Sequence, residues 1–286
     1  MAWLKRARVK FWVMDLNPDQ VVALGLARPD APSVRVFDWM NRWILRRASD
    51  TVLLDRFMLE RVRRKGPIPG RVHVIPPWPI EDVTADVPHA ANPWRRAQGL
   101  SNEVVVMYSG NHSPSNPLTT ILKAARRLRL ERDLVFMFVG GGAGKAEVDS
   151  EIAPNIRSLP YQPKETLRYS LAAADVHLVS MGNEVVGIVH PCKIYGAMAA
   201  GRPVIGLGPT ESHVGEIAAA DGIGWMVAHG DVDGAERVLR EVLGNARAGL
   251  PVMGARARSV IEARLSRTAL CGAFCNVLEL DLDTHA

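Results

Sequence analysis

A loop that carries an acid, a glycine and then a lysine is the strongest sign of chemistry in this sequence. Glu184 and Gly187 lie in the loop, which runs through His190-Pro-Cys-Lys193 into a predicted helix. The unused N–H groups and the dipole of a helix start favour an anion. A lysine in the first turn opposes that dipole, so its presence indicates a bound anion that offsets the repulsion.

A second polar loop follows an apolar run earlier in the chain. Gly110, Asn111 and His112 lie in it, and Asn116-Pro117 leads into the next helix. Gly110 permits close approach to the backbone, and the two side chains can donate hydrogen bonds to a phosphate or a sugar. The alternative interpretation is an ordinary turn that contains one histidine.

A glycine-rich run, Val139-Gly-Gly-Gly-Ala-Gly-Lys145-Ala146, follows the next apolar segment. It is not the phosphate loop of nucleotide hydrolases, because Val139 stands where that motif has its first glycine and Ala146 replaces the hydroxyl that binds magnesium. The spacing also excludes the dinucleotide-binding motif. The run is therefore interpreted as a strand-to-helix turn at the carboxyl edge of a sheet, where open α/β folds bind ligands. Tight-turn geometry alone is the alternative explanation.

These loops need a parallel sheet to position them, and the sequence predicts one from residue 101 onward. Short apolar runs alternate there with helical stretches. We place strands at 103–109, 133–139, 155–159, 175–180, 203–207 and 225–228. Pro117, Pro163 and Pro191 are each expected to be the first residue of a helix, and Gly201 is expected to end the helix that spans 191–200.

The first hundred residues predict a thinner sheet. Strands are expected at 10–14, 50–54 and 71–75, with an amphipathic helix at 34–47. The predicted domains are a truncated Rossmann-like domain (1–80), a linker rich in proline and alanine (81–100), a complete Rossmann-like domain (101–255) and helices that pack back toward the linker and the first domain (256–286).

Composition narrows the class of protein. The 286 residues suffice for about two domains, and 48% hydrophobic with 23% charged residues predict a globular protein. No apolar run is long enough for a membrane span or a signal peptide, so we expect a cytoplasmic protein. The three cysteines lack zinc-site spacing and are expected to be reduced thiols, and no metal is expected.

Charge is uneven along the chain. Residues 1–100 hold 17 basic and 10 acidic side chains, and residues 101–286 hold 18 and 20. The basic first part suits an anionic partner. The 34–47 helix combines aromatic residues with Arg35, Arg42, Arg46 and Arg47, a composition typical of a membrane interface, with a plain sheet-covering helix as the alternative.

The segment from Val104 to Val242 resembles the carboxyl-terminal domain of retaining GT-B glycosyltransferases of the family 4 type, in the capsule and exopolysaccharide branch. The branch has a Pro-Ser-Lys signature where this chain has Pro191-Cys192-Lys193. Supporting motifs are Tyr108-Ser-Gly-Asn-His112, Phe138-Val-Gly-Gly-Gly142, Asn155-Ile-Arg-Ser-Leu-Pro-Tyr161, Ala199-Ala-Gly-Arg-Pro-Val204 and Gly208-Pro-Thr-Glu-Ser-His213. Trp12-Val-Met-Asp15-Leu-Asn-Pro18 resembles a late strand of the acceptor domain.

The resemblance implies an α/β GT-B-like fold and a nucleotide-diphosphate sugar, commonly a UDP sugar, held between the domains without a metal. It implies transfer with retention to a glycan or lipid-linked acceptor in polysaccharide biosynthesis, at the inner face of the membrane. The catalytic residues implied are Glu184, His112 and Lys193. The donor-binding residues implied are Gly110, Asn111, Gly141, Gly142, Tyr161, Gly187, Ile188, His190, Pro191, Cys192 and Tyr195.

The chain departs from the family pattern in three ways. Gly196 stands where many members have a second glutamate, and Asn111 and Asn116 stand where many have an Arg and Lys pair. Complete members also have about a hundred residues before the equivalent of Lys10, so we expect a late start assignment or a fragment, with three strands that leave an open parallel edge.

Three rival functions follow from the same residues. The first is a catalytically silent nucleotide-sugar-binding module. The second is a sugar-nucleotide epimerase, which requires acids and a histidine from both domains that the short first domain does not offer. A nucleic-acid-binding protein is the least favoured, because no recognition motif accompanies the basic residues.

Overall fold

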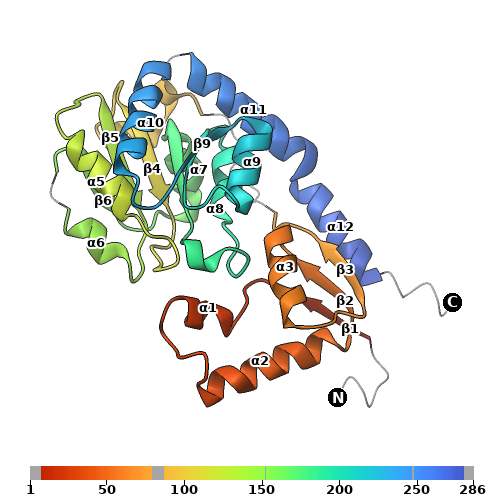
Figure 1. The fold of residues 1–286 in the computed structure, drawn as a ribbon. Coiled ribbons are helices and arrows are strands. Elements are labelled where there is room, and N and C mark those ends of the chain that lie inside the picture. The colour runs from red at the N-terminus through yellow and green to blue at the C-terminus, as the bar shows by residue number, and fades with distance from the viewer. Residues whose placement is uncertain (1–7, 79–86, 152, 247, 280–286) are drawn as a thin grey trace. The chain divides into compact units, whose positions relative to one another are not determined.

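Two parallel sheets organise the computed structural model, which describes residues 8–78, 87–151, 153–246 and 248–279 (Figure 1). The three-stranded sheet has the order β1-β2-β3, and the six-stranded sheet has the order β6-β5-β4-β7-β8-β9. The chain divides into two units. Unit 1 comprises residues 1–78, 184–190 and 267–286, and unit 2 comprises residues 79–183 and 191–266.

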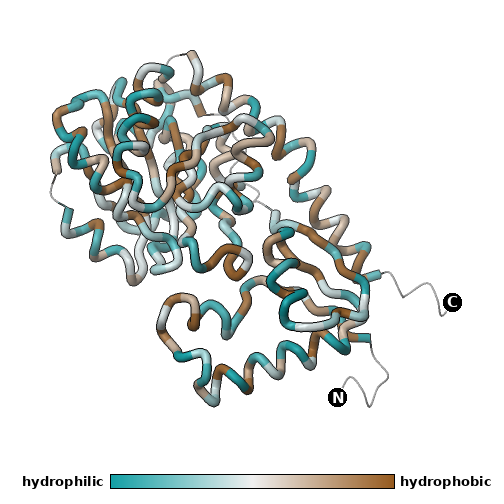
Figure 2. The backbone as a smooth tube through the Cα atoms, viewed as in Figure 1, coloured by the Kyte–Doolittle hydropathy of each residue, from teal (hydrophilic) through white to brown (hydrophobic). Residues whose placement is uncertain are grey.

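Unit 2 contains the larger sheet. Its strands are β4 (Val104–Ser109), β5 (Leu134–Val139), β6 (Ile156–Leu159), β7 (Val176–Ser180), β8 (Val204–Leu207) and β9 (Gly224–Val227). All six residues of β5 and all five of β7 are buried, as expected for strands that helices cover on both faces. Figure 2 shows these strands largely in the brown of hydrophobic residues.

Helices connect and cover the strands of unit 2. They are η2 (His89–Ala91), α4 (Pro93–Ala97), α5 (Thr119–Arg127), α6 (Lys145–Asp149), α7 (Lys164–Ala172), α8 (Lys193–Ala199), α9 (His213–Asp221), α10 (Val232–Asn245) and α11 (Gly249–Arg264). One hydrophobic core joins α5 and α10 to the sheet through Ile121, Phe136 and Leu239. A second core joins α8 and α11 through Ile194, Met198 and Ala257.

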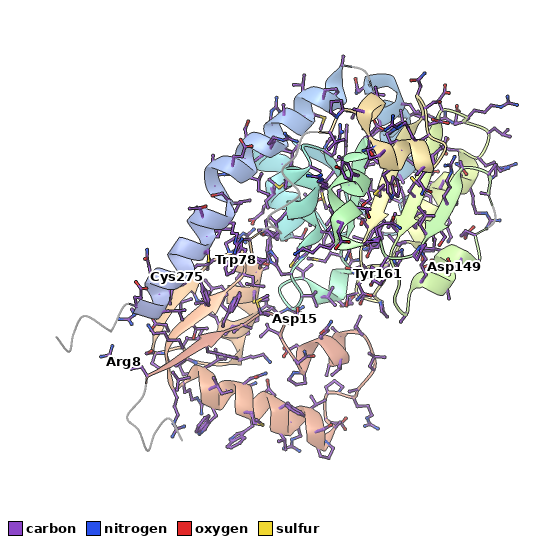
Figure 3. All side chains as sticks on the ribbon, turned by 180° about the vertical axis from the view of Figure 1, so that it is seen from behind. Arg8, Asp15, Trp78, Asp149, Tyr161 and Cys275 are labelled. Atoms are coloured by element: carbon purple, nitrogen blue, oxygen red, sulfur yellow. The ribbon has the colours of Figure 1, made fainter. Side chains whose placement is uncertain are left out.

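Unit 1 contains the smaller sheet and the segments that cover it. Its strands are β1 (Val9–Trp12), β2 (Ala48–Leu53) and β3 (Arg71–Val74), and its helices are α1 (Asp19–Ala23), α2 (Pro32–Leu45), α3 (Arg56–Lys65) and α12 (Arg267–Glu279). Trp12 contacts Phe274 of α12 with ring centres 4.5 Å apart, and Trp78, labelled in Figure 3, lies 6.0 Å from the same ring. The Lys10 ammonium donates to the Val277 carbonyl. The last helix therefore packs on the first strand.

All nine predicted strands form, with ends that differ by one or two residues. The prolines, however, lie before the helices rather than in their first turn: Pro163 is the N-cap of α7, while α5 and α8 begin two residues after Pro117 and Pro191. Gly201 does follow the end of α8, in a left-handed conformation with φ +65°.

The predicted domain boundaries need correction. The expected linker (81–100) contains η2 and α4, and its residues 81–86 lie outside the described part of the chain. Asn92 is buried, caps α4 and donates to the Tyr169 carbonyl, so this segment is integral to unit 2. Of the helices expected to pack toward the linker and the first domain, α12 belongs to unit 1, whereas α11 belongs to unit 2, where Ala257 and Ile261 are buried in one core with residues of α8. Residues 184–190, expected in the second domain, belong to unit 1.

Candidate functional site

The strand order of unit 2 reverses between β4 and β7, which are neighbours in the sheet. Open α/β sheets bind ligands outside the carboxyl ends of the strands at such a point. The loops that follow these two strands are tied together, because the Gly182 N–H donates to the Ser115 carbonyl (2.8 Å) and Ser180 Oγ donates to the Pro117 carbonyl (2.6 Å). Two of the three predicted polar loops therefore begin at one place.

The loop after β4 is also joined to the glycine-rich loop after β5. The His112 N–H donates to the Gly141 carbonyl (2.8 Å), and the Gly144 N–H returns a bond to the His112 carbonyl (2.8 Å). The Tyr108 hydroxyl donates to the Asn111 carbonyl (2.7 Å). These bonds fix the backbone of residues 110–112 and leave the Asn111 side chain exposed.

Steric fit explains Gly142 of the glycine-rich loop after β5. A side chain at Gly142, where φ is +125°, would overlap Asn111 Oδ1 and the His112 carbonyl. Gly141 is different, because a Cβ there would meet only the ring of Tyr161, at 3.1 Å. Tyr161, labelled in Figure 3, is 59% exposed and donates its hydroxyl to the Gly141 carbonyl (3.1 Å).

His112 is buried, with 1% of its surface exposed. Its Nδ1 donates to the Gly110 carbonyl (3.1 Å), while Nε2 has no hydrogen-bond partner among the described residues. Burial, together with the positive charges of Lys145 and Lys193, lowers the pKa of the ring to about 4. His112 is thus neutral at pH 7. The ring is buried and bonds its own loop through Nδ1, and its catalytic role stays a prediction.

Lys193, the first residue of α8, lies beside the loop after β4. Its Nζ is 5.1 Å from the centre of the Tyr108 ring, and its Cε would be 3.0 Å from a side chain at Gly110. Gly110, with φ +124°, leaves the space that this side chain occupies. Burial lowers the pKa of the ammonium, and within the described ranges no carboxylate forms an ion pair with it. A desolvated cation without a counter-charge is the chemistry of an anion site.

Lys145, at the start of α6, has a structural role. Its ammonium donates to the Phe138 carbonyl (2.8 Å) and the Leu159 carbonyl (2.9 Å), at the ends of β5 and β6. Burial lowers the pKa of this ammonium as well. Because its donors go to the backbone, the side chain joins two strands and is not directed to a ligand.

Three other predicted donor-binding residues, Pro191, Cys192 and Tyr195, lie within two positions of Lys193. Tyr195 is 1% exposed and its hydroxyl bonds His213 Nε2 at 2.8 Å, so it belongs to the core and offers little surface to a ligand. Pro191 is buried, whereas Cys192 is exposed. The donor-binding role of Tyr195 stays a prediction, for a side chain that the structure places in the core.

The remaining predicted residues lie in unit 1. The Glu184 carboxylate is exposed, and Gly187 has φ +71°. Ile188 is buried, with 2% of its surface exposed, so it offers little surface to a ligand. His190 is buried and its Nδ1 donates to Asp55 Oδ2 at 2.7 Å.

Sequence reasoning missed several residues that hold these groups. Asp55 and Arg61 bond the loop of residues 184–190, and the Tyr108 ring contacts both the His112 ring and the Lys193 ammonium. For Tyr108 a signal existed, because it is the second-last residue of a predicted strand and lies two positions before Gly110. For Asp55 and Arg61 none did, because more than a hundred residues separate them from the loop.

The described residues contain no cluster of three or more His, Cys, Asp or Glu side chains able to hold a metal ion. A search of the same residues for a helix long and apolar enough to cross a membrane finds none. Asp15, labelled in Figure 3, lies after β1, and burial raises the pKa of its carboxyl while the nearby His190 opposes the shift.

Comparison with protein families matches both parts of the chain. Residues 103–245 match the model described as "Glycosyl transferases group 1", and residues 1–78 match the "Glycosyl transferase 4-like domain". The first match covers half of the chain.

Two curated proteins are similar over most of the chain. It is 25% identical over 263 residues to the probable glycosyltransferase WbjE of Pseudomonas aeruginosa, and 25% identical over 288 aligned positions to the putative colanic acid biosynthesis glycosyl transferase WcaI of Escherichia coli. The alignments cover 89% and 96% of this chain. They span 64% of WbjE and 69% of WcaI.

Solved structures share the fold. Anabaena HepE in complex with UDP has a TM-score of 0.76 at 16% identity, over 97% of this chain and 73% of that one. WaaG, a glycosyltransferase of lipopolysaccharide biosynthesis, has a TM-score of 0.72 at 15% identity, over 94% of this chain and 74% of that one. The α/β fold expected from the sequence, that of the GT-B glycosyltransferases, is thus confirmed. With the family matches in both of its parts, the chain belongs to the glycosyltransferase group 1 family.

Proposed function

We propose that the chain binds a nucleotide-diphosphate sugar, with UDP as the nucleotide, and that it transfers the sugar with retention to a glycan or lipid-linked acceptor in polysaccharide biosynthesis. Family membership supports glycosyl transfer. The UDP complex of HepE and the colanic acid assignment of WcaI support the donor and the pathway class. No metal takes part in this proposal.

The single observation that carries the donor site is the ammonium of Lys193. It is desolvated, lies over Tyr108 beside Gly110, and has no carboxylate partner in the described part of the chain. A diphosphate would supply the missing counter-charge. The site lies at the reversal point of the six-stranded sheet, where such folds bind ligands.

The same cation serves the chemistry. When the nucleoside diphosphate leaves, negative charge develops on the β-phosphate. A fixed ammonium stabilises that charge more in the transition state than in the ground state, so it accelerates the reaction rather than only tightening binding. Its place in a poorly hydrated setting strengthens the effect.

Titration calorimetry with UDP and UDP-glucose tests the donor site. We expect Lys193→Met to weaken UDP binding by roughly a hundredfold, as for loss of a charge-assisted bond of about 3 kcal/mol. Lys164→Met, which removes an exposed lysine of α7, is the matched control and should bind as the unaltered chain does. Equal affinities of the two variants would contradict the proposal.

A catalytically silent nucleotide-sugar-binding module is the second candidate, favoured by the replacement of the second family glutamate with Gly196. Hydrolysis of UDP-glucose, measured by release of UDP, separates the two. Binding with turnover supports the transferase, and binding without turnover for any acceptor or water supports the module.

We also propose that α2 docks on an anionic lipid surface at the inner face of the membrane. Val36, Phe37, Trp39, Met40 and Trp43 are 42% to 63% exposed on this helix. Exposed arginines flank them, and the Arg47 guanidinium lies 4.4 Å from the Trp43 ring centre. Figure 2 shows brown and teal alternating along α2. Aromatic and basic side chains together suit the interface of an anionic bilayer.

Sedimentation with lipid vesicles tests this surface. We expect binding to vesicles that contain phosphatidylglycerol and much weaker binding to phosphatidylcholine alone. The double substitution Trp39→Gln and Trp43→Gln should abolish it, whereas Leu130→Gln, which removes an exposed hydrophobic residue of unit 2, should not. Equal sedimentation of both variants would exclude α2 as the docking surface.

A further inference from the structure

The loop of residues 184–190 belongs to unit 1, although it lies between two segments of unit 2 in the sequence. It follows β7 and precedes α8, so its neighbours in the chain are elements of the larger sheet. The loop forms hydrogen bonds with Leu16, Asp55 and Arg61, which all belong to unit 1. What holds it there determines where its exposed carboxylate lies.

Arg61 of α3 holds the first half of the loop by its backbone. Its Nε donates to the Val186 carbonyl (3.2 Å) and its Nη2 donates to the Glu184 carbonyl (3.2 Å). The Glu184 side chain takes no part in these bonds, and it has no hydrogen-bond partner among the described residues. The backbone is therefore fixed while the carboxylate stays available.

Asp55 holds the second half of the loop. Its Oδ2 accepts from His190 Nδ1 (2.7 Å), and its Oδ1 caps α3 by accepting from the Met58 N–H (2.8 Å). Both Asp55 and His190 are buried. One carboxylate thus links the start of a helix to the last residue of the loop.

Two further contacts leave the loop little freedom. The Leu16 N–H donates to the Ile188 carbonyl (2.9 Å), and a side chain at Gly187 would overlap the Phe57 carbonyl. Val185 and Ile188 are buried with 1% and 2% of their surface exposed. The loop is seated on α3 along its whole length.

We infer that Asp55 and Arg61 are positioning residues for donor recognition: they hold the loop of residues 184–190 so that Glu184 accepts hydrogen bonds from hydroxyl groups of the transferred sugar. This inference rests on the proposed function. It assigns recognition of the sugar to a loop that α3 holds.

Removing Asp55 or Arg61 should therefore change affinity for the sugar part of the donor and leave affinity for the nucleoside diphosphate unchanged. The quantity to measure is the ratio of the dissociation constants of UDP-glucose and UDP. Asp55→Asn is the sharpest variant, because asparagine is as good an N-cap as aspartate and so keeps α3 capped, but it presents an amide to His190. Arg61→Ala is the second variant. Arg64→Ala is its control, because among the described residues the Arg64 side chain donates only to a carbonyl of its own helix.

We expect Asp55→Asn and Arg61→Ala each to raise that ratio about fivefold to tenfold. A tenfold rise corresponds to the loss of about 1.4 kcal/mol of binding free energy, as for one hydrogen bond to the sugar. Arg64→Ala should leave it unchanged. In a Glu184→Ala background neither substitution should change the ratio further, because both act through the same carboxylate. Full additivity in that background would overturn the inference, as would weakened binding of UDP by the same factor.

Hydrogen exchange of the loop separates failure of this inference from failure of the proposed function. The amides of Ile188 and Val189 bond the Val185 carbonyl, so their exchange reports whether the loop is held. Exchange should rise roughly tenfold in Asp55→Asn and Arg61→Ala but not in Arg64→Ala. Unchanged exchange would overturn the positioning role whatever the ligand. If the exchange of the loop responds as expected but the protein binds neither UDP nor UDP-glucose, the result would instead contradict the proposed function.

Discussion

Two lysines lie at the carboxyl edge of the larger sheet, and burial lowers the pKa of both ammonium groups. Lys145 donates to the carbonyls at the ends of β5 and β6, whereas Lys193 lies over an aromatic ring and has no counter-charge in the described ranges. The same residue type therefore joins strands in one loop and is available to an anion in the other. A glycine-rich sequence next to a lysine does not by itself indicate an anion-binding lysine. The hydrogen-bond partners of the lysine decide whether its ammonium is available to an anion.

The structural role assigned to the glycine-rich loop before Lys145 is tested most strongly at Gly142. We expect Gly142→Ala to lower the free energy of unfolding by about 4 kcal/mol, because φ is +125° and the new side chain would overlap the loop after β4. Gly141→Ala, one residue earlier, should cost less than about 1 kcal/mol, because only the exposed Tyr161 ring must move. Urea unfolding measures both, and equal losses would refute the steric explanation.

Acid should destabilise unit 2 through His112 and His177, both of which burial holds at a pKa of about 4. The unfolded chain binds protons near pH 6.5 and the folded unit does not, so stability is complete above pH 6.5 and is lost as the pH falls toward 4. The loss reaches roughly 3 kcal/mol for each histidine. His112→Gln should remove about half of this dependence, as measured by urea unfolding between pH 4 and 8.

The same histidine compares the two lysines directly, since both lower its pKa and Lys145 has the larger effect. NMR titration of the His112 ring should show a greater rise of its pKa in Lys145→Met than in Lys193→Met. The reverse order would mean that Lys193 lies nearer the ring than Lys145 does.

Lys145→Met should lower the free energy of unfolding by about 2 kcal/mol, because the hydrogen bonds of the ammonium to the Phe138 and Leu159 carbonyls are lost. The UDP affinity of the folded protein should not change. Thermal unfolding and calorimetry give the two quantities, and lost UDP binding at full stability would reverse the roles assigned to the lysines.

Lys193→Met should have the smallest effect on stability and the opposite sign, a gain of about 1 kcal/mol or less, because it removes a partly buried charge that has no carboxylate partner among the described residues. In the unaltered chain the lowered pKa means that the Lys193 ammonium loses its proton at a lower pH in the folded state than in the unfolded chain. Stability should therefore rise with pH between the lowered value and 10.5, and UDP affinity should fall over the same range. A destabilised Lys193→Met variant would indicate that the ammonium already has a partner.

The sequence predicted the strands well because each is a short apolar run between turn residues, and burial on both faces requires that pattern. Helix starts were less accurate, because a proline before a helix can serve as the cap or precede it, as Pro163 and Pro191 do. These choices depend on the loop that enters the helix, which has no local signal.

For the site, spacing placed Lys193 and Gly110 at one sheet edge, and the structure brings them together. Burial could not be predicted: Tyr195 turns into the core toward His213, and His112 bonds its own loop. The seat of the 184–190 loop was beyond reach as well, because it depends on Asp55 and Arg61, which no local pattern connects with Glu184.

The contact of α12 with β1 determines when unit 1 can be completed during synthesis. Lys10 and Val277, which are joined by a hydrogen bond, are 267 residues apart in the chain, and the contacting rings of Trp12 and Phe274 have a similar separation in sequence. On the ribosome, every strand and helix of unit 2 emerges before the helix that covers the first sheet does. The packing of α12 on β1 can therefore form only after all of unit 2 has been synthesised, and a contact between segments so far apart in the chain forms slowly.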